Sequence, residues 1–217
     1  MKLPKDFYDR PTLDVAEGMI GKVLVRRLDD VRVAGVIVET EAYIGTTDLA
    51  CHASKGRTKR TEVMFGEPGR TYVYLIYGFH HCLNAVTEAR DFPAAVLIRA
   101  IEPLDGVDTM RRNRSRAVKD NDIGSGPGKL CQAMGIDRSI NDISLSGTTL
   151  WVEDRNLEPG RIVASPRIGV EYAGEYRDRP WRFFVEDNPH ISRHPMNRVN
   201  RVNRVHTKTP RRIRRKS

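Results

Sequence analysis

The sequence predicts an α+β fold, a single domain built on an antiparallel β-sheet. Segments rich in β-branched and aromatic residues follow one another with turn residues between them, which is typical of antiparallel strands. Helical patterns occur among them, and no internal repeat or second apolar block indicates another domain. We therefore expect one domain at residues 1–192, followed by a basic tail at residues 193–217.

The charge of the chain is unevenly placed. Residues 193–217 hold ten Lys and Arg and no acidic residue, so the other residues sum to −1, from the net charge of +9 minus 10. Such a tail has too little apolar content to fold alone, and we expect it to bind a phosphate backbone without sequence preference. A solubility tail, or an arm for another anionic partner, is the alternative.

Composition also excludes several classes of protein. No apolar run approaches the roughly 20 residues of a membrane span, and the N-terminal segment MKLPKDFYDRP lacks the apolar stretch of a signal peptide. Cys51, Cys82 and Cys131 form no CxxC pair, which argues against a structural zinc or a disulfide framework. We expect a cytoplasmic protein with no cofactor, no metal and no membrane partner, and a nucleoid-associated one if it is bacterial.

The N-terminal part begins with a helix and two strands. Thr12–Met19 is predicted to be helical, with Thr12 or Asp14 as its cap. Lys22–Arg27 is predicted to be a strand, and the paired aspartates of Leu28–Val31 indicate a turn into the next strand.

The next strand, Gly35–Tyr43, carries unusual chemistry. Two carboxylates and an aromatic ring on one face do not fit a solvated edge, because a buried carboxylate costs free energy unless it is paired or used. With His52 beyond the following turn, this face could form a water-activating pocket with an aromatic wall. The alternative is a carboxylate paired with an arginine beside an ordinary core tyrosine. One face of an ideal strand would carry Val36, Val38, Thr40 and Ala42, and the other Ile37, Glu39, Glu41 and Tyr43.

A hairpin is predicted next, with a strand at Thr71–Ile76, a turn near Gly78 and a return strand at Cys82–Val86. Tyr72 and Tyr74 share one face of its first strand. Tyr77 projects from the tip if it lies in the turn, where it could fill the gap left by an extruded base. Ordinary sheet packing of the tyrosines is the alternative.

Two polar residues in apolar strands need partners. Asn84 lies in the return strand, and Arg99 lies in the predicted strand Ala94–Ile101, on one face with Ala95 and Leu97. A buried arginine requires an anion. The candidates are Glu39, Glu41 or a bound phosphate.

The C-terminal half is predicted to alternate helices with short strands. The stretch GSGPGK does not have the spacing of a P-loop, although its turn and Lys129 could receive one phosphate. A charged linker is expected at Asn113–Asp122. The predicted helices are Pro103–Arg112 and Leu130–Ile136, and the predicted strands are Thr148–Val152, Arg161–Val163 and Pro180–Glu186.

Several long motifs, in one order, resemble the alkyladenine (3-methyladenine or methylpurine) DNA glycosylase family. The resemblance covers roughly residues 7 to 192. It rests on VETEAY at Val38–Tyr43, Ala50–His52, PGRTYVYLIYG at Pro68–Gly78, Cys82–Asn84, AVLIRAIEPL at Ala95–Leu104, SGPGKLCQA at Ser125–Ala133 and RIGVEYAGE at Arg167–Glu175.

The resemblance implies a curved antiparallel core flanked by helices, with a pocket for a flipped base. Glu41 matches the family's general base and Arg99 its active-site arginine, while Tyr77 matches the side chain inserted into the duplex. Cys51 and His81 depart from the family pattern, which bears on lesion selectivity. The positions matching the base pocket are Tyr43, His52, Tyr74, Asn84 and Leu97.

The resemblance thus implies a monomeric DNA-repair hydrolase acting on duplex DNA with alkylated or deaminated purines. We expect no lyase step, because no lysine lies in Val38–Tyr43 or Tyr72–Tyr77. The alternatives are a non-catalytic damage-binding module and a metal-dependent nuclease that uses Glu39, Glu41 and histidines.

Overall fold

A computed structural model of the chain describes residues 1–114 and 118–193. Of the predicted basic tail, only Arg193 lies among the described residues. Part of the predicted linker Asn113–Asp122 also lies outside them.

Strands dominate the described part of the chain, and the helices are short. None of these helices has the length and hydropathy to cross a membrane. The α-helices are α1 (Lys5–Tyr8), α2 (Thr12–Gly18), α3 (Val107–Asn113) and α4 (Pro127–Ala133). The strands are β1 (Val23–Leu28), β2 (Val31–Ile44), β3 (Thr71–Ile76), β4 (His80–Val86), β5 (Ala94–Asp105), β6 (Leu150–Glu153), β7 (Ile162–Ser165) and β8 (Arg182–Val185).

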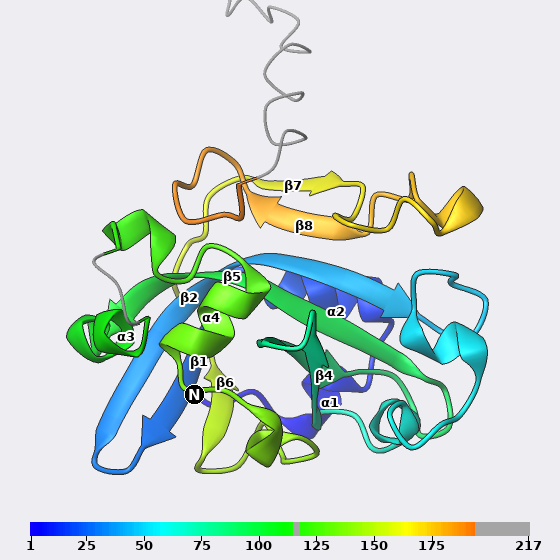
Figure 1. Cartoon of the computed structure of the whole chain (residues 1–217), viewed down its shortest axis with the longest axis horizontal. Coiled ribbons are helices and arrows are strands. Elements are labelled where there is room, and N and C mark those ends of the chain that lie inside the picture. Colours follow the sequence, from blue (N-terminus) through cyan, green and yellow to red (C-terminus); the bar gives the residue numbers. More distant parts are fainter. Residues whose placement is uncertain (115–117, 194–217) are drawn as a thin grey trace, which may run out of the picture.

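These strands form one open antiparallel sheet, which confirms the predicted α+β class. Its main path runs β3-β4-β5-β2-β1-β6. One edge of β2 is shared, because β1 pairs with residues 31–36 and β8 pairs with Glu39–Glu41. Figure 1 shows β2 bending across the molecule, with β7 and β8 beyond it on one side. The long strand β2 therefore joins both parts of the sheet.

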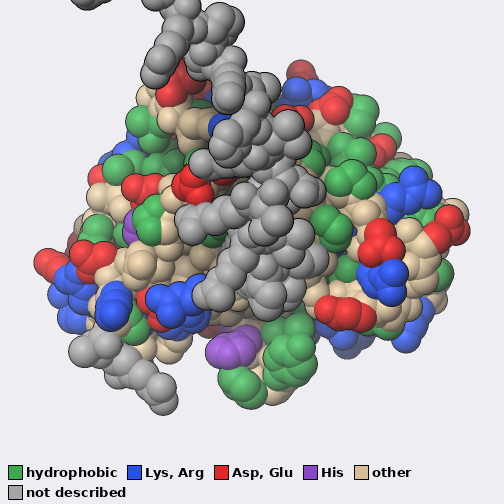
Figure 2. Space-filling model, turned by 90° about the horizontal axis from the view of Figure 1, so that it is seen from above, with side chains coloured by type: hydrophobic (Ala, Val, Ile, Leu, Met, Phe, Trp, Pro, Cys, Tyr) green, Lys and Arg blue, Asp and Glu red, His purple; other side chains and the backbone are tan. Residues whose placement is uncertain are grey.

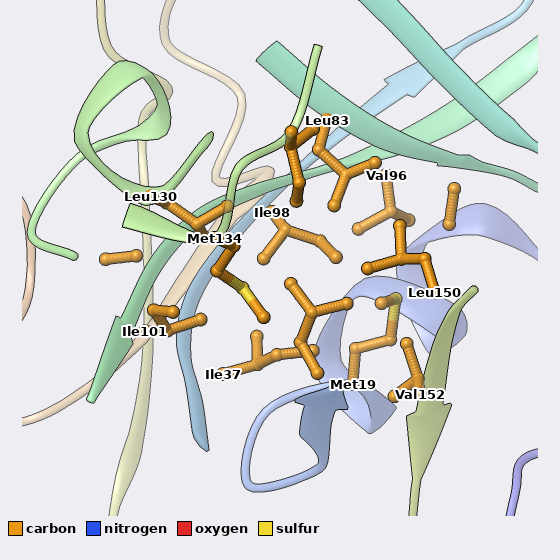
Figure 3. Packing of buried hydrophobic residues seen from close by; sticks show 14 of the residues in the cluster. Met19, Ile37, Leu83, Val96, Ile98, Ile101, Leu130, Met134, Leu150 and Val152 are labelled. Atoms are coloured by element: carbon orange, nitrogen blue, oxygen red, sulfur yellow. The ribbon is translucent and has the colours of Figure 1, made fainter. Parts of the chain in front are cut away.

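The hydrophobic core lies between the sheet and the helices α2 and α4. Helix α2 contacts β2 and β5, and α4 contacts β4 and β5. Apolar side chains from elements far apart in the sequence meet there, and this burial is the main stabilising term of the fold. Figure 3 labels Met19, Ile37, Leu83, Val96, Ile98, Ile101, Leu130, Met134, Leu150 and Val152.

Charged side chains are mixed on the surface viewed from the β7–β8 side. Figure 2 shows acidic and basic side chains interspersed on this face, and a group of hydrophobic side chains projects at one edge beside a histidine. This mixture fits the near-zero net charge of residues 1–192.

The expected alternation of Gly35–Tyr43 is broken by a β-bulge. The pairing of β2 with β5 shifts register between Ile37 and Thr40, and an extra residue in one strand reverses which face the side chains take. Ile37 and Val38 both pack into the main core. The prediction that Ile37 shares the face of Glu39 and Glu41 is therefore wrong.

Two predicted helix boundaries also need correction. The expected helix Pro103–Arg112 starts too early, because β5 continues to Asp105 and α3 follows it. Pro103 is tolerated there because it lies beside a register shift of β2 and β5. Conversely, α4 begins three residues before Leu130, at Pro127, a residue suited to the first helical turn.

The cap predicted for α2 is also wrong. The N-cap position before the helix is Pro11, which makes no side-chain capping hydrogen bond, so neither Thr12 nor Asp14 is the cap. Thr12 instead directs its hydroxyl and its backbone N–H to the carboxylate of Glu88, at 2.6 and 3.0 Å.

Two glycines allow the chain to pack closely around Ile101. A Cβ at Gly35 would lie 2.7 Å from Ile101 Cδ1, and one at Gly124 would lie 2.6 Å from Ile101 Cγ1 and 2.8 Å from its carbonyl oxygen. Neither position leaves room for a methyl group.

We therefore expect Gly124→Ala to lower the free energy of unfolding by about 1–3 kcal/mol, the usual cost of overpacking a core. Urea unfolding measures this change. The control is Gly18→Ala in α2, where the new methyl group would meet only ordinary contacts of 3.4–3.5 Å. Equal stabilities of the two variants would contradict this description of the core.

Candidate functional site

A cavity of about 420 Å³ opens where β2, β3, β4 and β5 meet the loop after β7 and the start of α4. This volume is in the range of small-molecule sites. Most of the predicted site residues line the cavity. These residues are Tyr43, His52, Tyr74, Tyr77, Asn84, Leu97 and Arg99. Glu41 lies directly behind the wall.

Aromatic rings form one wall of the cavity. Tyr72 and Tyr74 share a face of β3 because they are two residues apart, and their ring centroids are 5.3 Å apart. The ring of His52 lies edge-on to Tyr74 at 4.5 Å, and its Nδ1 is 2.9 Å from the hydroxyl of Tyr72. Tyr72 was predicted to lie on this face, but no site role was predicted for it.

His52 is held in its neutral form. Burial, followed by the positive charges of Arg60 and Lys55, lowers the pKa of His52 from its usual 6.5 to about 4. A neutral imidazole donates with one nitrogen and accepts with the other. His52 is therefore suited to hydrogen-bonding a base or a sugar, not to giving up a proton at neutral pH.

The carboxylate of Glu41 is fully buried and accepts three hydrogen bonds. Its Oε2 accepts from the hydroxyl of Tyr43 at 2.8 Å and from Nη1 of Arg99 at 3.1 Å, while Oε1 accepts from the backbone N–H of Ile168 at 2.7 Å. All three donor residues line the cavity. A carboxylate has about four acceptor positions, so one position on Oε1 remains.

The sequence left open whether the anion paired with Arg99 is Glu39, Glu41 or a bound phosphate, and the structure pairs it with both glutamates. Its guanidinium contacts Glu39 as well as Glu41, with Nε 3.0 Å from Glu39 Oε1. The phosphate alternative is not needed to explain the burial of this arginine.

Asp48 and Arg167 form a buried ion pair that was not predicted from the sequence. The guanidinium of Arg167 donates to both oxygens of Asp48, at 2.6 and 2.8 Å, and to the carbonyl of Ala42 at 2.8 Å. It also lies over the ring of Tyr43, 4.7 Å from the centroid. The motif at Arg167–Glu175 was an available signal, but it indicated no partner.

The hairpin between β3 and β4 carries exposed aromatic side chains at its tip. Tyr77 and Phe79 are 79% and 70% exposed, so the expected projection of Tyr77 from the turn is confirmed. Tyr77 has a φ of +53°, a conformation that costs a non-glycine residue roughly 1–2 kcal/mol. Such strain in an exposed aromatic residue favours a functional role over a packing role.

Asn84 of β4 and Leu97 of β5 are paired in the sheet, and both line the cavity. The amide of Asn84 donates to the carbonyl of Tyr72 at 2.9 Å. Asn84 thus has a partner within the hairpin, as its burial requires.

The start of α4 forms another part of the cavity wall. Lys129 is ion-paired with Asp122, and the hydroxyl of Ser125 donates to the same carboxylate at 3.0 Å. Burial alone would raise the pKa of Asp122, but the hydrogen bonds from Lys129 and Ser125 outweigh burial and lower it. That this turn receives a phosphate stays a prediction.

The sequence matches the family model described as methylpurine-DNA glycosylase over residues 6–189. The chain belongs to the methylpurine-DNA glycosylase family. This membership confirms the resemblance and the expected class of enzyme, a DNA glycosylase that hydrolyses N-glycosyl bonds.

The similarity to curated relatives extends over nearly the whole length of those proteins. A protein of Methanocella arvoryzae is 58% identical over 193 residues, which are 88% of this chain and 96% of that protein. A protein of Alkaliphilus oremlandii is 47% identical over 201 residues, which are 89% of this chain and all of that protein. Both carry the name "Putative 3-methyladenine DNA glycosylase".

The low pKa of His52 makes the stability of this glycosylase depend on pH. As the pH falls below 6.5, the unfolded chain binds a proton that folded His52 binds only near pH 4. The stability from the neutral imidazole is therefore complete above pH 6.5 and is lost as the pH falls toward 4. Urea unfolding at pH 4.5–7.5 should show the native protein losing more stability than His52→Gln. Parallel curves for the two proteins would contradict a neutral, buried His52.

Proposed function

We propose that this chain turns a damaged purine out of duplex DNA into the aromatic cavity and hydrolyses its N-glycosidic bond with a water oriented by Glu41. One observation carries the proposal: Tyr43 and Arg99, two residues of the cavity wall, hold the carboxylate of Glu41. A base inside a duplex is inaccessible, so it must be extruded before reaction.

The cavity wall suits alkylated purines, such as 3-methyladenine and 7-methylguanine. Alkylation makes the purine cationic, which weakens the N-glycosidic bond, and a cation is attracted by aromatic faces. Guanidinium groups already lie over the rings of Tyr43 and Tyr74, from Arg167 at 4.7 Å and Arg60 at 5.1 Å. These charges weaken the preference for a cation, so neutral hypoxanthine and ethenoadenine also belong among the proposed substrates.

The proposed chemistry places a water at the remaining acceptor position of Glu41. An ionised carboxylate there can align the water, take its proton and stabilise the sugar cation that develops as the bond breaks. Because the carboxylate is closed off from solvent, the shell formed by Tyr43, Arg99 and Ile168 has to open toward the cavity when the nucleotide enters.

The remaining site residues are proposed to hold the DNA. Asn84 and Leu97 bound the base pocket, His52 hydrogen-bonds the base or the sugar-phosphate, and Tyr77 enters the space that the extruded base leaves. Lys55, Lys59 and Arg60 are exposed on the loop that carries His52, where they can reach phosphates. The basic tail adds further phosphate contacts, and one monomer suffices for all these roles.

We expect Glu41→Gln to reduce excision by about 10²–10⁴-fold, the range for removing a general base, while lesion binding is retained. Single-turnover release of 7-methylguanine measures the rate, and a gel-shift assay measures binding. The matched control is Glu17→Gln, because Glu17 is an exposed residue of α2.

The same variant tests the non-catalytic binding module. The closed hydrogen-bonded shell of Glu41 is compatible with that alternative as well, since it would also fit a purely structural carboxylate. Near-native excision by Glu41→Gln would rule out the proposed mechanism. No release by the native protein from any duplex carrying methylated purines, hypoxanthine or ethenoadenine would favour the binding module.

We further expect simple hydrolysis without strand cleavage. The lysine that lines the cavity, Lys129, is paired with Asp122, and a charged ammonium cannot attack the sugar aldehyde. Borohydride added during the reaction should therefore trap no covalent protein–DNA adduct, and the abasic product strand should stay intact until alkali is added. An adduct that disappears in Lys129→Arg would show a lyase step instead.

The nuclease alternative is tested in the same reactions. The carboxylates of Glu39 and Glu41 are directed at arginines, an arrangement that does not favour metal binding. Base release should be unchanged in excess chelator. Strand scission that requires a divalent cation would support the nuclease.

A further inference from the structure

Glu39 is a buried ionisable residue that has no role in the chemistry proposed above. Its side chain is fully buried and accepts four hydrogen bonds. They come from Nε of Arg99 at 3.0 Å, Nε of Arg182 at 2.7 Å, and the backbone N–H and hydroxyl of Ser192, both at 2.7 Å. A carboxylate with this many donors is a rigid anchor.

This anchor determines how Arg99 faces Glu41. The guanidinium is planar, with its donors in a fixed fork. When Glu39 holds Nε, rotation of the guanidinium is restricted, and Nη1 is directed to Oε2 of Glu41 at 3.1 Å. Glu39 and Glu41 of β2 thus share Arg99, and Glu39 orients the guanidinium toward Glu41.

Glu39 is itself held in place from two sides. Arg182 is the first residue of β8. Its guanidinium lies 4.4 Å from the ring centroid of Phe184, and its Nη1 donates to the hydroxyl of Ser165 at 3.0 Å. Burial alone would raise the pKa of Glu39, but the charges of Arg99 and Arg182 and the hydrogen bonds from Ser192 outweigh burial and lower it. The carboxylate is therefore ionised at neutral pH.

Ser192 comes from a distant part of the chain, 153 positions from Glu39. It ends a segment, residues 188–192, that lies after the last strand. This segment is fastened to the domain by the amide of Asn188, which donates to Glu102 at 2.9 Å, and by Ser192 itself. The basic tail begins at the next residue.

We propose that Glu39 is a positioning residue for base excision and that Ser192, at the point where the tail begins, clamps it in the orientation that directs Arg99 to Glu41. The proposal rests on the proposed function of Glu41. A purely structural ion cluster is the competing explanation, and it would affect stability without affecting the rate per folded molecule.

The experiment compares full-length variants in single-turnover release of 7-methylguanine from a short duplex, well below their melting temperatures. Ser192→Ala should reduce the rate about 10-fold, the factor expected for one hydrogen bond to a charged group. Affinity for the duplex should stay within about 2-fold, because Ser192 does not line the cavity. Ser192→Thr keeps the hydroxyl and should restore the rate.

The matched control is Ser139→Ala. Ser139 also donates its N–H and its hydroxyl to one carboxylate, that of Asp137, but on the exposed surface. This variant should excise at the native rate. Glu39→Gln, where it folds, should show a larger loss than Ser192→Ala.

Native rates in Ser192→Ala, or a lowered melting temperature with an unchanged rate, would overturn the proposal. A loss that Ser192→Thr fails to restore would also count against the hydroxyl clamp. Failure of the proposed function is distinguishable from these outcomes, because the native protein would then release no base.

Discussion

The structure around the cavity depends on one buried guanidinium placed between two carboxylates. Arg99 bonds Glu39 and Glu41 at 3.0 and 3.1 Å, with both carboxylates fully excluded from solvent. Each charge alone would be costly to bury, so the three side chains require one another. Their geometry comes from the sheet, since the two glutamates lie two residues apart on β2 and the arginine lies on β5, the neighbouring strand.

The cavity is built outward from this charged cluster. The hydroxyl of Tyr43 is bonded to Glu41, and the ring is backed by the Arg167–Asp48 pair, which ties residues of three chain segments together. Rings from β3 and the loop at His52 line the same cavity as Tyr43. A buried carboxylate beside an aromatic cavity suits a reaction in which positive charge develops on a sugar, because the carboxylate can stabilise that charge once its hydrogen-bonded shell opens toward the cavity.

Much of this arrangement follows from local sequence patterns. Alternation placed Tyr72 with Tyr74 and Leu97 with Arg99, and the need of a buried arginine for an anion indicated Glu39 or Glu41. The bulge in β2 could not be predicted, because Ile37 and Val38 give no local signal that both will enter the core. The pairs Asp48–Arg167 and Glu39–Ser192 could not be predicted from local patterns either, because they join residues 119 and 153 positions apart in the sequence.

The central claim is that Glu41 orients the water that attacks the sugar of a purine turned out of the duplex. A crystal structure of Glu41→Gln bound to a duplex with a single 7-methylguanine tests this claim most directly. The account predicts the purine between Tyr43, His52 and Tyr74, Tyr77 inserted in the duplex, and a water between residue 41 and the anomeric carbon. A lesion that remains stacked in the duplex, or a position 41 still sealed behind Tyr43 and Arg99 with no water beside it, would contradict the account.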